Sequence, residues 1–408
     1  MHNIIYLIKN IVKLHQRILN LAIAFILSVC LSVGLSQAMA ADKNLAGAEY
    51  NWNLPEWTPE PVVPEDNPMT AAKVELGRYL FYEPRLSITG EHTCASCHKQ
   101  SLAFTDGKPV AIGATNEAHS RNSMSLANMA YNPVFTWANP LMTDLENQAL
   151  IPIFGEHPVE MGMVGKEEEI LTWMRQDPNY KQMFDSAFSQ EEQPVNIKNM
   201  TKALASFQRS LVSFKSPYDR YRYMGEENAI SAAAKRGEKL FNSERAECFH
   251  CHGGINFSDS LKHENLAFVE IAFHNTGLYN IDGEGSYPLP NTGVNEITHE
   301  AKDMGRFKAP TLRNIALTAP YMHDGSVATL RDAIAHYQAG GRTIAEGELA
   351  GVGSQNPYKS GFIKGFEITD SETEDLIEFL HSLTDEEFIT NPDYSDPYGV
   401  VDRAVSQK

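Results

Sequence analysis

Cysteine is scarce in this chain of 408 residues, which contains only five. One of them, Cys30, lies in an apolar stretch near the N-terminus, and the other four form two close pairs, Cys94 with Cys97 and Cys248 with Cys251. Both pairs belong to motifs with another use for the thiols, so no cysteine is left for a structural disulfide.

Basic residues are also few, with 34 Lys and Arg against 52 Asp and Glu. The first 40 residues hold three of the basic residues and no acidic ones, which leaves 31 against 52 and a formal charge of −21 beyond them. This surplus argues against binding to nucleic acid or to anionic membrane surfaces, and it permits a protein partner with a basic patch.

The N-terminus reads as a targeting segment. Lys9, Lys13 and Arg17 precede an apolar run from Leu19 to Leu35, and Ala38-Met39-Ala40 follows. A basic region, an apolar region and an A-x-A site predict a signal peptide over 1–40, cleaved after Ala40. An uncleaved membrane anchor is the alternative, but the run is short for a span. We therefore expect a periplasmic protein with no stable membrane span after processing.

The two cysteine pairs each complete a C-x-x-C-H motif, Cys94-Ala-Ser-Cys97-His98 and Cys248-Phe-His-Cys251-His252. Two thiols at this spacing can add across the haem vinyl groups, and the next residue supplies an imidazole for the iron. One such match could be half of a zinc site or a redox dithiol. Two complete matches favour two covalently bound haem c groups.

A short pattern precedes each motif. Leu-Phe follows Gly77 and Gly237 at the same spacing, inside segments that read as helices over 71–81 and 233–241, so the chain resembles an internal duplication. We predict a mainly α fold with two cytochrome c-like domains, one haem in each, and long loops between helices. The predicted divisions are a signal peptide at 1–40, an extended arm at 41–68, haem domains at 69–225 and 226–395, and a tail at 396–408.

Other helices follow from periodicity and capping. Apolar residues at helical spacing predict a helix over 197–211, and a polar stretch broken by Pro and Gly at 216–228 predicts the domain boundary. Thr329 with Asp332 resembles a capping box that opens a helix through Tyr337, which Gly340-Gly341 ends. We expect a Gly-rich loop over 340–365 and a final amphipathic helix over 370–383.

Several residues after the second motif could ligate the second iron opposite His252: Met304, Met322, His323, His336 and Tyr337. In the capped helix, Leu330, Ala333, Ile334 and Tyr337 recur at i, i+3, i+4 and i+7 and share one face. His336 points about 100° away from Tyr337. Periodicity places Tyr337 on the apolar face without settling which residue is the ligand.

Five further stretches give the chain a resemblance to the bacterial di-haem cytochrome c peroxidase superfamily over nearly all of 65–390. It looks closest to the MauG members, and closer still to the MbnH-like branch. The stretches are Arg121-Asn-Ser-Met-Ser-Leu-Ala-Asn128, Leu145-Glu-Asn-Gln148, Phe154-Gly-Glu-His-Pro-Val-Glu160, Ala309-Pro-Thr-Leu-Arg-Asn314 and Thr318-Ala-Pro-Tyr-Met-His-Asp-Gly325.

For the first haem, the resemblance implies a site open to peroxide. His98 would be the proximal ligand, and Ala114 stands after Ile-Gly where peroxidases of the superfamily carry a capping histidine; the nearby His119 is a possible substitute. Glu160 matches the distal carboxylate that handles protons, Gln148 the polar pocket residue, and Pro152 the distal proline. Trp137 matches the tryptophan between the haems.

For the second haem, the resemblance implies Tyr337 as the ligand, because MauG-like members carry tyrosine where the peroxidases carry methionine. A phenolate is hard and anionic and favours the higher oxidation states of iron. Asn122, Thr318 and Pro320 match residues that hold a calcium ion between the haems. Ala246 stands near the place of a surface tryptophan of MauG, which leaves open how oxidising equivalents reach the surface.

The resemblance implies an oxidoreductase that uses hydrogen peroxide to oxidise an aromatic residue, tryptophan in this branch, on a periplasmic partner protein at a distance. MbnH-like relatives suggest a copper-binding partner. The alternative is a cytochrome c peroxidase that reduces peroxide with electrons from a small cytochrome c. A third reading, an electron carrier without catalysis, is disfavoured by an open first iron beside Glu160.

Overall fold

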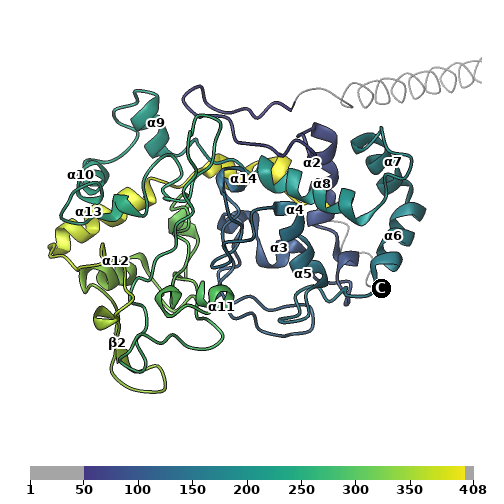
Figure 1. The fold of residues 1–408 in the computed structure, drawn as a ribbon. Helices are drawn as coiled ribbons and strands as arrows, with labels where there is room; N and C mark the ends of the chain where they lie inside the picture. The colour runs from purple at the N-terminus through teal and green to yellow at the C-terminus, as the bar shows by residue number, and fades with distance from the viewer. Residues whose placement is uncertain (1–49, 400–408) are drawn as a thin grey trace, which may run out of the picture.

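The computed structural model describes residues 50–399, and Figure 1 shows them as two helical halves joined by long loops. The predicted signal peptide and the end of the predicted tail lie outside these residues. Within the described part, no helix is long and apolar enough to cross a membrane. The predicted mainly helical fold is confirmed, and the only sheet among these residues is one two-stranded hairpin.

The helices of the first half are α2 (Ala71–Phe81), α3 (Cys94–Cys97), α4 (Leu145–Gln148), α5 (Leu150–Phe154), α6 (Glu167–Gln176), α7 (Pro178–Ala187) and α8 (Ile197–Ser210). Those that follow are α9 (Pro217–Tyr223), α10 (Ala232–Phe241), α11 (Asn295–Thr298), α12 (Leu330–Gln338), α13 (Asp370–His381) and α14 (Glu386–Thr390). The strands β1 (Thr343–Ile344) and β2 (Gly351–Val352) pair antiparallel within the expected Gly-rich loop.

The same helix pair occurs in each half, which supports an internal duplication. Helix α2 packs against α8 and α10 packs against α13, with a glycine at each crossing. A Cβ at Gly77 would overlap the carbonyl oxygen of Ala203, and a Cβ at Gly237 would overlap that of Asp375. Only glycine lets the two backbones approach so closely.

Aromatic packing repeats around each crossing. Phe81 contacts Phe207 of the partner helix, with ring centroids 5.2 Å apart, and lies 6.0 Å from Phe104. In the second half Phe241 lies 5.1 Å from Phe379 and 6.2 Å from Phe257. Each trio therefore joins a helix pair to the loop that follows a C-x-x-C-H motif.

Two expectations about the connecting segments need correction. Residues 216–228 are not simply a broken linker, because α9 begins there with Pro217 at its first position and a capping box between Ser216 and Asp219. The helix α13 is not the last, since α14 follows it. The yellow C-terminal segment in Figure 1 crosses back to the first half, where Phe388 packs into the core cluster of α2 and α8.

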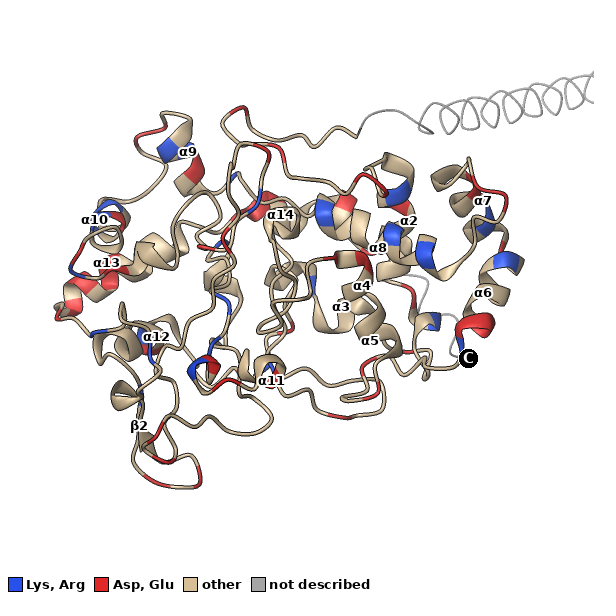
Figure 2. Ribbon diagram, in the orientation of Figure 1, with Lys and Arg blue, Asp and Glu red and all other residues tan. Residues whose placement is uncertain are grey.

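The domain limits remain a prediction. The described part of the arm, 50–68, contains no helix or strand, and its Trp52, Leu54 and Trp57 pack against a cluster around Tyr131 and Phe214. Charged residues lie mainly along the outer helices, for example the acidic first turn of α6 (Figure 2). Acidic side chains in the first turn stabilise a helix because they interact favourably with the positive end of its dipole.

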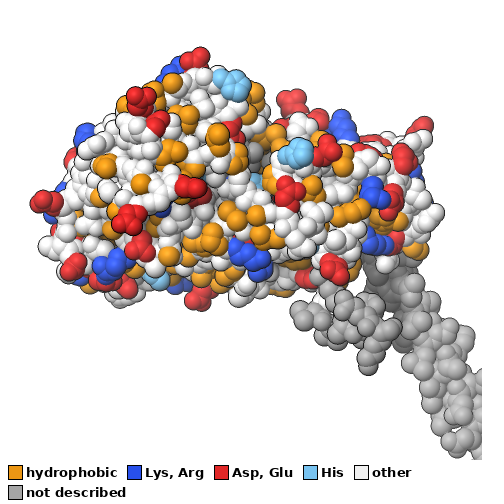
Figure 3. Space-filling model, turned by 90° about the horizontal axis from the view of Figure 1, so that it is seen from below, with side chains coloured by type: hydrophobic (Ala, Val, Ile, Leu, Met, Phe, Trp, Pro, Cys, Tyr) orange, Lys and Arg blue, Asp and Glu red, His pale blue; other side chains and the backbone are white. Residues whose placement is uncertain are grey.

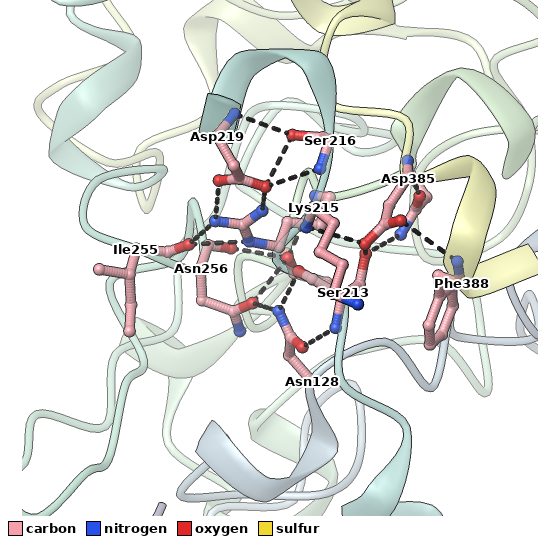
Figure 4. A network of polar contacts seen from close by, with 12 residues as sticks. Asn128, Ser213, Lys215, Ser216, Asp219, Ile255, Asn256, Asp385 and Phe388 are labelled. Atoms are coloured by element: carbon pink, nitrogen blue, oxygen red, sulfur yellow. Dashed lines mark hydrogen bonds and ion pairs between the residues drawn. The ribbon is translucent and has the colours of Figure 1, made fainter. Parts of the chain in front are cut away.

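A polar network ties the halves together behind these clusters (Figure 4). Arg313 and Asp219 form a fully buried ion pair, with Nη1 2.8 Å from Oδ2. Arg313 also donates to the carbonyl of Ile255, which lies just after the second motif. Asn128 of the first half donates to Asn256 and accepts from the backbone of Ser213.

Candidate functional site

The first motif forms the one-turn helix α3, with a capping box between Thr93 and Ser96. The next residue, His98, has its Nδ1 2.8 Å from the carbonyl oxygen of Phe104. Phe104 has φ of 61°, and this turn aims its carbonyl back at the imidazole. A hydrogen bond donated by Nδ1 leaves the Nε2 lone pair free for a metal.

The second motif has the same arrangement. His252 Nδ1 lies 3.1 Å from the carbonyl oxygen of Phe257, which also has a positive φ, of 49°. Burial lowers the pKa of both His98 and His252, although the hydrogen bonds to the two carbonyls act in the opposite direction. Both imidazoles are therefore neutral at pH 7, as iron ligation requires.

A large cavity lies against the second motif. Cys248, Cys251 and His252 line one part of it, and Trp137 lines another. The face of α12 predicted from periodicity also lines this cavity, through Leu330, Ala333, Ile334 and Tyr337. An apolar cavity with two thiols and a neutral imidazole at one wall fits a covalently bound haem.

The candidates for the second axial ligand divide by position. Tyr337, Met322 and His323 line the cavity that His252 lines, whereas Met304 and His336 are not among its lining residues. Burial raises the pKa of the Tyr337 hydroxyl above its ordinary value. His336 is buried on another side of α12, and neither of its ring nitrogens has a hydrogen-bond partner in the described structure. Tyr337 as ligand stays a prediction.

The residues proposed for peroxide chemistry come together beside the first motif. The backbone N–H of Ala114 donates to the carbonyl of Glu160 at 2.6 Å, and that of Met161 donates to the carbonyl of Pro152 at 2.9 Å. Gln148 ends α4, one helical turn before Pro152 in α5. Glu160 is close enough to His98 to act on its pKa. Burial lowers the pKa of this imidazole, and the negative charge of Glu160 partly offsets that effect.

His119 is oriented toward Glu160. Its Nε2 lies 3.6 Å from Glu160 Oε1, and its Nδ1 accepts a hydrogen bond from the backbone N–H of Arg121 at 3.0 Å. With Nδ1 accepting, the neutral ring carries its proton on Nε2, where it can be shared with the carboxylate. In the described structure the His119 ring therefore faces the Glu160 carboxylate, and its place as a cap on the first iron stays a prediction.

Trp137 lies where the two halves meet. Its indole Nε1 donates to the carbonyl of Asn122 at 2.9 Å, and its own carbonyl accepts from the backbone N–H of Lys308. Thr105 lines the same cavity and directly follows the Phe104 that holds His98. The indole therefore lies between the two motifs.

The three residues expected to hold calcium, Asn122, Thr318 and Pro320, all line this cavity. The Asn122 side-chain amide donates to the carbonyl of Lys108 at 2.8 Å. Its Oδ1 has no donor among the described residues, and an amide oxygen with backbone carbonyls is a ligand set that Ca²⁺ accepts. Calcium binding itself stays a prediction.

Lys308 was missed by sequence reasoning. It is buried, lines the cavity, and donates from Nζ to the carbonyl of Val134 at 3.0 Å. Burial lowers its pKa to about 8. The sequence signal for Lys308 was its position directly before the Ala309–Asn314 stretch, one of the stretches that carry the family resemblance.

Comparisons with known proteins find similarity along most of the chain. A family model described as di-haem cytochrome c peroxidase matches residues 71–228. The methylamine utilization protein MauG of Methylorubrum extorquens is 33% identical over 362 residues, covering 88% of this chain and 91% of that protein. The cytochrome c551 peroxidase of Pseudomonas aeruginosa is 30% identical over 317 residues, covering 78% and 80% respectively.

Solved structures extend the likeness to the fold. The crystal structure of a MauG-like protein associated with microbial copper homeostasis is 47% identical, with a TM-score of 0.83, and covers 86% of this chain and 100% of that chain. The diheme peroxidase BthA from Burkholderia thailandensis is 19% identical with a TM-score of 0.61, covering 84% and 90%, and it shares the fold.

Proposed function

Because the chain belongs to the di-haem cytochrome c peroxidase and MauG family, we propose that it uses hydrogen peroxide to oxidise an aromatic residue, tryptophan, of a partner protein. The family makes it a peroxidase-type oxidoreductase with two haem groups. The observation that carries the finer proposal is Tyr337, a tyrosine that lines the cavity shared with His252. The 47% identity to a MauG-like protein associated with copper homeostasis supports a copper-binding partner.

In this proposal Cys94, Cys97 and His98 hold one haem, and Cys248, Cys251 and His252 hold the other. When bound, haem supplies an iron that reacts with peroxide and accepts electrons. The protein's part is to hold two neutral imidazoles by their Nδ1 hydrogen bonds to Phe104 and Phe257. These bonds fix the ring orientation and keep each Nε2 available.

Glu160 moves the protons of peroxide in the first site. Its carboxylate would take a proton from one peroxide oxygen and return it to the other, which leaves as water. His119 keeps this carboxylate aimed through Nε2, and Pro152 and Gln148 shape the rest of the pocket. Ala114 has no side-chain donor for iron, so this side of the site stays open to a small oxidant.

Tyr337 distinguishes this proposal from an ordinary peroxidase, and Trp137 would link the two haem sites in either. A tyrosine oxygen is a harder ligand than a methionine sulfur, so Tyr337 favours oxidised iron in the second site. Trp137 lies between the motifs, where an indole can pass an electron across the gap. Asn122, Thr318 and Pro320 line the same cavity as this indole and would hold a Ca²⁺ there through oxygen ligands from both halves of the chain.

The balance of the reaction requires a protein that gives up electrons. Each hydrogen peroxide takes two electrons and two protons and leaves as two waters. For each peroxide, the partner tryptophan and one water together lose two electrons and two protons, and the hydroxyl group left by that water replaces a ring hydrogen of the tryptophan. We place this reaction in the periplasm, where covalent haem is attached and where a signal peptide over 1–40 would deliver the chain.

The test uses the holoprotein with hydrogen peroxide and the protein encoded beside its gene. Mass spectrometry of the partner should show oxygen added at a tryptophan, and Glu160→Gln should slow this by roughly 10²- to 10⁴-fold, the usual contribution of a general acid–base group. Glu156→Gln, on the same loop, is the matched control and should leave the rate unchanged.

A cytochrome c peroxidase is the second candidate, favoured by the 30% identity to the cytochrome c551 peroxidase. It predicts rapid oxidation of a reduced small cytochrome c and an unmodified partner. That result in the same assay would replace the proposed function.

A further inference from the structure

Electrons from a partner need a path to the second haem site. The second attachment motif offers no readily oxidised side chain at the surface, so this path cannot begin there. Ala246, two residues before Cys248, is buried and its side chain cannot be oxidised. The aromatic groups of this motif and its surroundings are Phe249, His250 and Phe362; the Phe249 ring is tilted against that of His250, on which Phe362 stacks. None of these three side chains gives up an electron readily, so the route must begin elsewhere.

A second, smaller group of residues around His252 lines another pocket beside the second motif. His252 lines it together with Phe257, Tyr218 and Tyr223. The Tyr218 ring lies 5.4 Å from that of Phe257, whose carbonyl accepts the hydrogen bond of His252. Tyr218 is therefore an oxidisable group close to the imidazole that is expected to bind iron.

From Tyr218 a row of aromatic rings continues outward. Tyr223, at the end of α9, has its ring centroid 6.5 Å from that of Tyr218. Trp57 of the N-terminal arm stacks on Tyr223 at 3.9 Å with an interplanar angle of 12°. Tyr223 is 39% exposed, so the row ends at the surface. The three rings are the most readily oxidised kinds of side chain apart from cysteine and methionine.

The first member of the row has a place for its proton. Tyr218 donates its hydroxyl hydrogen to Glu238 Oε1 at 3.3 Å. A phenol that loses an electron becomes strongly acidic, so a carboxylate within hydrogen-bond reach lowers the cost of oxidation. Trp57 differs, because its Nε1 is buried and has no acceptor in the described structure. Its indole keeps its proton while an electron passes.

We propose that Tyr218, Tyr223 and Trp57 carry electrons from a docked protein to the second haem site, which makes the surface around Tyr223 the place where oxidising equivalents leave. This inference rests on the proposed function. Tyr218 gives one electron inward and its proton to the Glu238 carboxylate. It then takes an electron from the stacked Tyr223 and Trp57 and recovers the proton from Glu238. The oxidised stack takes an electron from the partner, and two such passages match one hydrogen peroxide.

A competing row exists and supplies the control. Tyr287 lines the main cavity, and its ring lies 5.4 Å from that of Tyr279. Both of these rings are nearly inaccessible to solvent, and Tyr279 donates to Asp324 at 2.6 Å. This row stops inside the protein, whereas the row through Tyr218 reaches the surface.

The experiment treats the holoprotein with one equivalent of hydrogen peroxide in the absence of any partner. Freeze-quench electron paramagnetic resonance on protein with ring-deuterated tyrosine should show a tyrosyl radical, and a nitroso spin trap followed by peptide mass spectrometry should place the adduct on Tyr223 or Trp57. In Tyr218→Phe the adduct should fall by about tenfold or more, which corresponds to about 1.4 kcal/mol in the barrier. Phenylalanine keeps the ring packing, and Tyr279→Phe, in the row that stops inside the protein, should leave the adduct unchanged.

The outcomes separate the route from the proposed function. An adduct that survives Tyr218→Phe, or one that is lost in Tyr279→Phe, overturns the route. A partner that is modified at the wild-type rate by Tyr218→Phe protein also overturns it, while the proposed function stands. If the partner remains unmodified but the Tyr223 adduct depends on Tyr218, the route stands and the proposed substrate is wrong. Equal haem content and equal initial peroxide consumption in all variants show that the first site is intact.

Discussion

Tyr337 and His336 are neighbours on α12 with opposite surroundings. Tyr337 faces the cavity shared with His252, while His336 is buried without a hydrogen-bond partner for either ring nitrogen. We predict that Tyr337→Phe removes the low-spin signal of the second haem in electron paramagnetic resonance and leaves the high-spin signal of the first unchanged. His336→Leu, similar in size to the histidine, should change neither signal. A shifted low-spin signal in His336→Leu would identify the histidine as the ligand.

Lys308 makes a prediction for the dependence of stability on pH. Burial lowers its pKa from 10.5 to about 8, so between these values the unfolded chain binds a proton that the native protein does not. Stability should therefore rise with pH in this window, by up to about 3 kcal/mol from this group. Below about pH 8 Lys308 is charged in both the folded and the unfolded protein, so its contribution to the free energy of unfolding no longer changes with pH.

The measurement is urea unfolding of the wild type and of Lys308→Met at several values of pH. Methionine keeps the length of the side chain and removes the charge, so the difference between the two proteins should shrink as pH rises through 8 to 10. A constant difference would mean that a buried anion, such as a haem carboxylate, holds Lys308 in its charged form.

At the scale of elements, two glycines decide how the helix pairs cross. A Cβ at Gly77 or Gly237 would overlap a backbone oxygen of the facing helix, and backbone cannot move aside as a flexible side chain can. Gly77→Ala and Gly237→Ala should each lower the free energy of unfolding by roughly 1–3 kcal/mol, the usual cost of overpacking. Gly361→Ala is the control, because nothing lies within 4 Å of its position. Equal stabilities for all three would show that the helices are not held by this contact.

The long helices were predictable from the sequence because their signals are local. Thr329 caps α12 through the N–H of Asp332 as expected, and α2 has its predicted bounds. The helix α9 was missed because its tyrosines and arginines have no clear apolar period. Its sequence signal was the Ser216 to Asp219 capping box with Pro217 inside it.

The candidate site was predictable where it depends on short motifs and the resemblance. Glu160, Ala114 and Pro152 come together as expected. The contact between His119 and Glu160 was not foreseen, because it depends on how two loops meet in space. The burial of Lys308 was not foreseen either, because its Nζ donates to the carbonyl of Val134, which lies far away in the chain.

For the whole molecule, the buried pair of Arg313 and Asp219 joins segments that lie 94 residues apart. Asp219→Asn would leave the guanidinium uncompensated in the interior, at a cost of about 3–5 kcal/mol. Glu374→Gln breaks the exposed pair with Arg331 and should cost less than about 1 kcal/mol. Urea unfolding followed by haem absorbance and by tryptophan fluorescence measures both. Coincident stability of Asp219→Asn and the wild type would show that the pair contributes nothing.

Hydrophobic side chains are spread over the face seen from below, with acidic groups between them (Figure 3). Among the described residues, the most exposed large apolar side chains are Leu141, Phe268 and Leu289. Scattered apolar residues are normal on a protein surface, so this face alone does not identify a docking site.

The return of the C-terminal segment to the first half has a consequence for biogenesis. Gln100, two residues after His98, donates to the carbonyls of Phe388 and Asn391, and the Phe388 ring packs on Phe104. A chain exported from its N-terminus delivers these partners last. If, as proposed above, the chain is exported and its first motif receives a haem, that motif would stay accessible for haem attachment while nearly 300 further residues emerge. The contacts of Gln100 and Phe104 with the C-terminal segment form only when the end of the chain arrives, which would let haem insertion precede final folding.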